Sequence, residues 1–245
     1  MLTTAIILAA AILLMAALYS SVGHAGASGY LAAMALAGVA PAVMKPTALT
    51  LNILVALIAT ARFYRAGFFS WRVLLPFALS SVPFAFLGGA LTLPGSVYQK
   101  VVGCALLFAA YRLWARAARR ADAEAKPVPL PAAVALGAGI GLLSGITGVG
   151  GGIFLSPILL LAGWAETRQA SGVAAAFILV NSAAGLAGHF ASVRNVPDSI
   201  YLWGAAAVVG GLIGTELGRR RLATVTLRRV LSAVLVIAGL KMVLT

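Results

Sequence analysis

Ten apolar runs, separated by short polar or glycine-rich breaks, fill almost the whole of this 245-residue chain. A helix needs about 20 apolar residues to cross the hydrocarbon core of a bilayer, and most of the runs approach that length. Charged residues make up only 9% of the sequence and the mean hydropathy is +1.05, which is too apolar for a water-soluble protein of this size. The runs therefore predict an all-α polytopic membrane protein with a single membrane domain over residues 1–245. They are Leu2–Tyr19, Ala25–Val39, Ala42–Ala61, Trp71–Leu91, Val97–Ala115, Pro129–Leu143, Gly152–Trp164, Ala170–Phe190, Ile200–Leu217 and Val225–Leu244.

The second half of the chain resembles the first. Three glycines of the first half recur at a constant spacing of 125 residues, and later matches drift from this spacing by a few residues, as small loop insertions would produce. The matched glycines are Gly23, Gly26 and Gly38, followed by Gly148, Gly151 and Gly163. The second run of each half is short and begins at glycines. We expect two repeats of about five segments each, residues 1–121 and 127–245, with eight to ten helices according to whether the short runs cross, re-enter or are broken.

Basic residues gather in three loops, which predicts that these loops face the cytoplasm. The residues are Arg62, Arg65 and Arg72; Arg112, Arg116, Arg119, Arg120 and Lys126; and Arg219, Arg220, Arg221, Arg228 and Arg229. Two segments separate the first pair of loops and four separate the second, so both termini are expected outside the cell membrane and the repeats are expected to be inverted. Membrane topology thus accounts for the net charge of +13, and we expect no nucleic-acid partner.

The stretch GITGVGGG, from Gly145 to Gly152, places five glycines among eight residues between apolar runs. Short, glycine-broken helices in inverted repeats indicate a binding site near the bilayer midplane. The first N–H groups of a helix have no partner within it and carry partial positive charge, so they can hold an anion as they hold phosphate in soluble proteins. We expect the breaks of the two halves to face each other and bind a small anion. Scattered glycines such as Gly137, Gly139 and Gly210 are instead expected to allow close helix packing.

The predicted substrate-binding residues are the glycines of the two breaks and the polar side chains in or beside them. They are Gly23, His24, Gly26, Ser28, Thr47 and Asn52 in the first half, and Thr147, Gly148, Gly150, Gly151, Gly152, Ser171 and Asn181 in the second. His24 can carry charge near neutral pH, whereas the hydroxyls and amides would donate hydrogen bonds without making release difficult. Lys45, which precedes Pro46, is expected in a short turn on the outer side. His189 is expected at the membrane interface.

The pattern Gly148-x-Gly150-Gly151-Gly152, followed by Pro157, a leucine-rich run and Ala170-Ser171, resembles the sulfite exporter TauE/SafE family over nearly the whole chain. The resemblance implies a small bacterial permease for sulfite, sulfonates or related sulfur anions, held within a lipid bilayer. The first-half copy departs from this pattern, because GHAGASG replaces the glycine triplet. The resemblance leaves the particular anion and the oligomeric state open, a homodimer included.

No Asp or Glu lies deep in an apolar run, so a carboxylate relay for proton coupling is missing from the sequence. Export of an anion from a cell that is negative inside needs no coupled ion, and we expect export. The single Cys104 and the lack of clustered His, Cys and carboxylates argue against a metal or another cofactor. Two alternatives remain: an anion channel, and an intramembrane serine protease that uses Ser28 of the GASG segment with a histidine.

Overall fold

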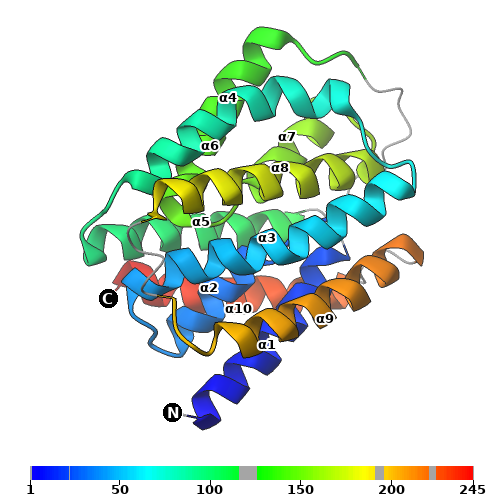
Figure 1. The fold of residues 1–245 in the computed structure, drawn as a ribbon. Helices are drawn as coiled ribbons and strands as arrows, with labels where there is room; N and C mark the ends of the chain where they lie inside the picture. The colour runs from blue at the N-terminus through cyan, green and yellow to red at the C-terminus, as the bar shows by residue number, and fades with distance from the viewer. Residues whose placement is uncertain (1, 22, 116–125, 191–195, 221–224, 245) are drawn as a thin grey trace.

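The computed structural model describes residues 2–21, 23–115, 126–190, 196–220 and 225–244. Within these ranges the regular structure consists of ten α-helices, which confirms the all-α prediction (Figure 1). The helices are α1 (Leu2–Ser20), α2 (Ala27–Leu36), α3 (Pro41–Arg65), α4 (Trp71–Ala90), α5 (Gly95–Ala115), α6 (Leu130–Thr147), α7 (Gly152–Leu161), α8 (Thr167–Gly188), α9 (Ile200–Arg220) and α10 (Val225–Leu244). Each apolar run corresponds to one helix. The basic linker between the two predicted repeats lies largely outside the described residues.

In the part of the chain that the structure describes, six helices are long and apolar enough to cross a bilayer: α1, α3, α4, α6, α8 and α9. By contrast, α2 and α7 have ten residues each, which corresponds to a rise of about 15 Å. The hydrocarbon core of a bilayer is about 30 Å thick. The short second segment of each half is therefore a half-helix, too short to cross by itself.

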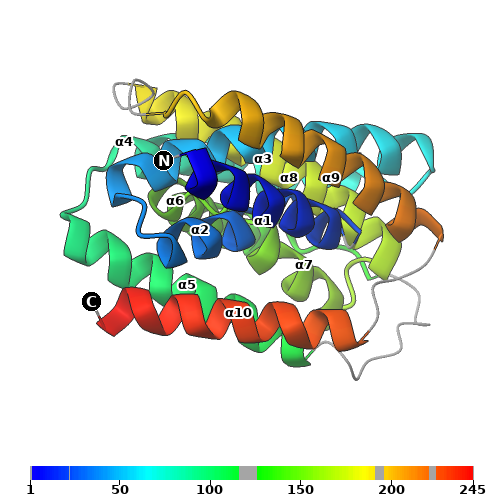
Figure 2. The ribbon, with the colours of Figure 1, turned by 90° about the horizontal axis from the view of Figure 1, so that it is seen from below.

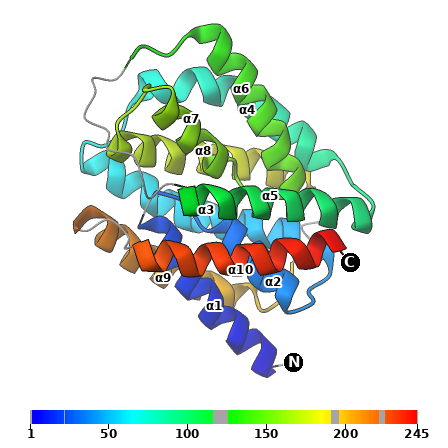
Figure 3. The same ribbon diagram turned by 180° about the vertical axis from the view of Figure 1, so that it is seen from behind.

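Helices α3 and α8 form the centre of the bundle, with 61% and 67% of their most apolar windows buried. They are antiparallel, because Gly172 near the start of α8 lies against Phe63 near the end of α3, and Gly185 near the end of α8 approaches Leu49. In Figure 1, α4 and α6 lie on one side of this pair and α1 and α9 on the other. Figures 2 and 3 show α5 and α10 side by side along a third face.

The main contacts between helices are reciprocal between the two halves, except that α2 packs on α1 and α10 whereas α7 lacks comparable packing on α6 and α5. If α1–α5 are exchanged for α6–α10, the pair α4 and α6 becomes the pair α9 and α1, and both pairs are in contact. In the same way α4 with α8 becomes α9 with α3, and α7 with α8 becomes α2 with α3, and all of these pairs are in contact too. The central pair α3 and α8, and the outer pair α5 and α10, map onto themselves. A duplicated chain would produce such a pattern.

Glycines set the close approach within the two flanking pairs. A Cβ atom at Gly141 of α6 would collide with the backbone carbonyl of Ser81 in α4, and one at Gly214 of α9 would collide with that of Ala17 in α1. This agrees with the packing role expected for scattered glycines. Gly139 is an exception, because a Cβ there would have no neighbour within 4 Å.

Lys45 and Pro46 lie inside α3, so the prediction of a short turn at these residues is wrong. The helix begins earlier, at Pro41, where a proline loses no hydrogen bond because the first N–H groups have no partner. Pro46 falls early in the helix and interrupts only one backbone hydrogen bond there. Lys45 is consequently carried into the bundle, where its side chain is buried.

Candidate functional site

The two glycine-rich breaks have matching backbones. The first break, residues 23–26, precedes α2, and the second break, residues 148–151, precedes α7. The three glycine pairs that flank α2 and α7 have positive φ, a conformation that strains other residues: Gly23 (78°) with Gly148 (81°), Gly26 (102°) with Gly151 (81°), and Gly38 (74°) with Gly163 (68°). The N-caps of α2 and α7 are Gly26 and Gly151, and neither helix has a side-chain cap. The first N–H groups of both half-helices therefore remain available to another acceptor.

The second break is held between α3 and α8 by an amide and a hydroxyl. Asn52 Nδ2 donates to Val149 O at 3.4 Å and to Ser182 Oγ at 3.3 Å. A Cβ atom at Gly150 would lie 2.8 Å from Asn52 Nδ2 and 3.0 Å from Ser182 Oγ, so only a glycine fits between them. Asn52 and Ser182 have no exposed surface. The backbone of the break thus lies directly against polar groups of both central helices.

The remaining residues of the second break are also fixed by buried contacts. Thr147 Oγ1 accepts a hydrogen bond from Val149 N at 3.3 Å, and Thr147 O accepts one from Tyr98 OH at 3.2 Å. Gly151 and Gly152 pack against side chains of α8. Residues 147–153 are all buried, so the break is closed to solvent in this structure.

The first break reaches α7 through His24. His24 Nε2 lies 3.3 Å from Ser156 Oγ, and Ser156 lies one turn beyond Gly152 along α7. Gly23 packs so closely on Ser171 of α8 that no side chain fits between them. His24 thus joins the first break to α7, and both breaks contribute residues to one hydrophobic cluster.

The other predicted side chains are buried as well, and three of them hold unpartnered polar atoms. Ser28 lies in the first turn of α2, and Thr47 has no exposed surface. The amide of Asn181 donates to Phe177 O within its own helix at 3.0 Å. Buried atoms without a hydrogen-bond partner include Thr47 Oγ1, Asn52 Oδ1 and Asn181 Oδ1. Such atoms are rare in proteins. These three lie on the two central helices, and others lie on α1, α5 and α6.

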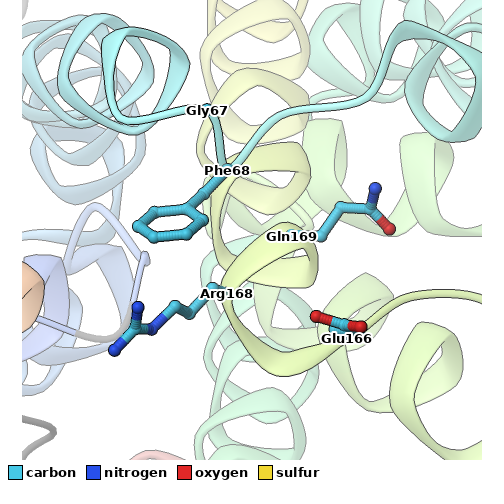
Figure 4. A pocket seen from close by; sticks show the side chains of 5 residues that line it. All are labelled: Gly67, Phe68, Glu166, Arg168 and Gln169. Atoms are coloured by element: carbon cyan, nitrogen blue, oxygen red, sulfur yellow. The ribbon is translucent and has the colours of Figure 1, made fainter. Parts of the chain in front are cut away.

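A pocket of about 520 Å³ opens where α3 ends and α8 begins (Figure 4). It is lined by Gly67, Phe68, Glu166, Arg168 and Gln169. The guanidinium of Arg168 lies 5.0 Å from the centre of the Phe68 ring, a cation–π distance. A carboxylate and a guanidinium thus share this pocket. One of its lining residues, Gln169, lies two residues before Ser171, the serine that packs on the first break.

Some residues of the site were missed by sequence reasoning. Ser156 is the only polar side chain of α7, which was an available signal, whereas nothing local indicated that Tyr98 would reach the second break from α5. His189, which was expected at the membrane interface, directly follows the last residue of α8. It is 8% exposed, and its Nδ1 lies 3.1 Å from Gly89 O at the end of α4.

Comparison with known proteins agrees with this architecture. The profile of the family described as Sulfite exporter TauE/SafE matches residues 8–242. A protein of Sinorhizobium fredii (strain NBRC 101917 / NGR234), described as "Probable membrane transporter protein y4hK", is 44% identical over 244 residues, 98% of each chain. No solved structure matches the chain. The chain is a multi-pass membrane transporter that belongs to the sulfite exporter TauE/SafE family.

Proposed function

We propose that this transporter is a secondary carrier for a small anion, a sulfur oxyanion or an organosulfonate, which binds between the two glycine breaks near the bilayer midplane. The observation that carries the proposal is the pair of uncapped half-helices, α2 and α7, whose N-termini begin at matched glycines. Helix N-termini bind anions through free N–H groups and the helix dipole. The family description, sulfite exporter, agrees with a ligand of this class.

The side chains around the breaks suit reversible binding of an oxyanion. His24 and Ser156 lie at the contact between the first break and α7, and Asn52 can turn donors toward a ligand at the second break. The unpartnered oxygens of Thr47 and Asn181 would accept from a protonated oxyanion or from water that enters with it. Each unsatisfied buried group costs about 1–3 kcal/mol, so a ligand or water that pairs with them stabilises the occupied state.

The reciprocal packing supports two inverted repeats, residues 1–121 and 127–245. In transporters of this kind, rocking of one repeat against the other exposes a midplane site to each side in turn. We propose that the end of the bundle with Arg62 and Arg168 faces the cytoplasm and that both termini lie outside. This orientation follows the loop charges.

Export is the proposed direction. The described carboxylates, Glu166, Asp198 and Glu216, lie in loops or near a helix end. The described residues therefore include no carboxylate relay for proton-driven uptake. When an anion leaves a cell that is negative inside, its free energy falls by about 2.3 kcal/mol per charge for each 100 mV of membrane potential.

The protease alternative does not fit the family, whose members are transporters. The geometry also disfavours it, because His24 Nε2 faces Ser156 and His189 lies at the end of α4. Neither histidine is thereby placed as a base for Ser28.

The test is purification, followed by a thermal-shift screen against sulfite, thiosulfate, methanesulfonate, sulfate and acetate, because a ligand of the native state raises its stability. Anions that stabilise the protein are then tested for flux in proteoliposomes. We expect a sulfur anion to stabilise the protein and to show saturable flux with counterflow. Flux without saturation or counterflow would indicate a channel, and no response to any sulfur anion would refute the proposed substrate class.

A further inference from the structure

A buried lysine lies at the end of the bundle opposite Arg62 and Arg168. Lys45 is 4% exposed, and its Nζ donates to the carbonyls of Gly88 at 3.3 Å, Gly89 at 2.9 Å and Leu91 at 3.3 Å. These carbonyls end α4, where the helix dipole is negative and a cation is favourable. The ammonium thus joins the start of α3 to the end of α4.

The charge of Lys45 is not balanced by a carboxylate. Among the described residues no Asp or Glu lies within ion-pair distance of it. His189 follows the last residue of the α8 span and shares the Gly89 carbonyl. Burial, reinforced by the nearby Lys45 charge, lowers the pKa of His189, while its hydrogen bond to Gly89 acts in the opposite sense. The imidazole is therefore harder to protonate than a free histidine, and Lys45 supplies the cation of this cluster. Buried charges in proteins are normally paired, so this site calls for a counter-ion.

The ammonium borders a pocket that can hold one. The Lys45 pocket has a volume of about 210 Å³ and is lined by Pro41, Ala42, Lys45, Leu91, Thr92, Leu93, Gly95, Tyr98 and His189. It contains no carboxylate among these residues. The pocket also adjoins the second break, because the hydroxyl of Tyr98 donates to Thr147 O and the backbone of Lys45 packs against Gly148.

The two ends of the bundle are built alike but charged differently. At one end Arg62 Nη1 of α3 donates to Leu212 O of α9 at 2.6 Å and to Thr215 Oγ1 at 2.8 Å. At the other end the counterpart contact joins His189, after α8, to Gly89 of α4. The pocket near Arg168 also contains a carboxylate, whereas the Lys45 pocket does not. Of these two pockets, the Lys45 pocket is the one in which no described carboxylate accompanies the cation.

We propose that the Lys45 pocket is a second anion site, an antechamber through which the sulfur oxyanion or sulfonate passes between the second break and the aqueous phase. When the anion binds, the Lys45 ammonium exchanges one of its carbonyl partners at the end of α4 for the anion. Tyr98 lies between the Lys45 pocket and the binding site at the second break. The inference rests on the proposed function for the identity of the anion, but binding in the pocket can be measured without transport.

The test measures the electrostatic preference of the pocket in detergent-solubilised protein. Cys104, the one cysteine of the chain, is replaced by Ala, and Ala42→Cys then places a thiol one helical turn from Lys45 within the pocket. Modification rates are compared for an anionic and a cationic methanethiosulfonate reagent, with and without methanesulfonate, and gluconate serves as the control anion. We expect the anionic reagent to react faster, methanesulfonate to slow it, and Lys45→Gln to lower the anionic-to-cationic rate ratio by about fivefold or more.

Lys241→Gln is the matched control. Lys241 Nζ donates to Ala35 O at 2.8 Å and Leu36 O at 3.2 Å, so it also contacts carbonyls that end a helix, but it lines a neighbouring pocket. Its replacement should leave the rate ratio within about twofold. An unchanged ratio in Lys45→Gln, or no protection by methanesulfonate when Lys45 is intact, would overturn the proposal. The second comparison remains valid if Lys45→Gln does not fold. Loss of anion flux in proteoliposomes with labelling protection retained would instead refute the proposed function alone.

Discussion

Replacement of Asn52 by Ala tests whether the second break is held by the side chains of the central helices. The change removes the donor to Val149 O and to Ser182 Oγ. The Val149 carbonyl is then left buried without its side-chain partner, which costs about 1–3 kcal/mol. For a chain of this length, each kcal/mol lowers Tm by about 2–4 °C. We therefore expect Asn52→Ala to lower Tm by about 2–12 °C.

Asn181 provides the matched control for this prediction. It has the same side chain on the other central helix and is equally buried, but its amide donates only to Phe177 O within its own helix. That carbonyl retains its backbone partner in the helix, so Asn181→Ala should lower Tm by less than about 3 °C. Both variants are measured by thermal unfolding in the same detergent without ligand.

A double-mutant cycle with Ser182→Ala isolates the contact itself. Because Asn52 donates directly to Ser182, the two substitutions should be coupled by about 0.5–1.5 kcal/mol. The neighbouring pair Asn181 and Ser182 has no such bond, so its coupling should be smaller than that of Asn52 and Ser182. Equal Tm values for Asn52→Ala and Asn181→Ala, together with zero coupling, would show that the break is held in another way.

Three further predictions concern packing, binding and the opposite end of the bundle. Gly139→Ala should raise Tm, because the new methyl group meets no neighbour and the helix gains about 0.5–1 kcal/mol of stability. Gly141→Ala should abolish folding or lower Tm strongly, because its methyl group would collide with the Ser81 carbonyl. Size-exclusion chromatography and thermal unfolding measure both effects. His24→Ala and Ser156→Ala should each weaken binding of the transported anion by about 5- to 10-fold, measured from ligand-dependent thermal shifts, with sub-additive effects in combination. Arg62→Gln should lower the maximal flux in proteoliposomes more than it changes the half-saturating concentration, because Arg62 ties α3 to α9 away from the two breaks.

The sequence predicted the helices and the backbone of the breaks well because both depend on local or repeated features. Apolar length alone locates a membrane helix. The recurrence of glycines such as Gly26 and Gly151 at one spacing indicated conserved backbone shape between the halves, and positive φ at both residues is what a glycine requirement implies. The half-helical length of α2 and α7 was visible in the short apolar runs.

Contacts between distant segments could not be predicted in the same way. The hydrogen bond from Asn52 to Val149 depends on which face of α3 meets the second break. Because α3 is largely apolar on all sides, its sequence does not indicate which face that is. Pro46 suggested a turn, although a proline early in a helix costs little. That error placed Lys45 at the surface, when three carbonyls at the end of α4 in fact surround its ammonium. The position of α4 relative to α3 is set by tertiary packing, and no local sequence feature indicates it.

The two breaks share a backbone but differ in what they present to a ligand. At the 125-residue spacing His24 corresponds to Val149, and each lies two residues before the N-cap glycine of its half-helix. Val149 contributes its carbonyl, which is held by Asn52, whereas His24 contributes a ring that reaches Ser156 of the opposite half. A ligand between them would meet backbone and amide on one side and an imidazole on the other. We therefore expect the half that departs from the glycine triplet to distinguish one anion from another, and exchange of the residues at positions 24 and 149 should alter selectivity before it alters the fold.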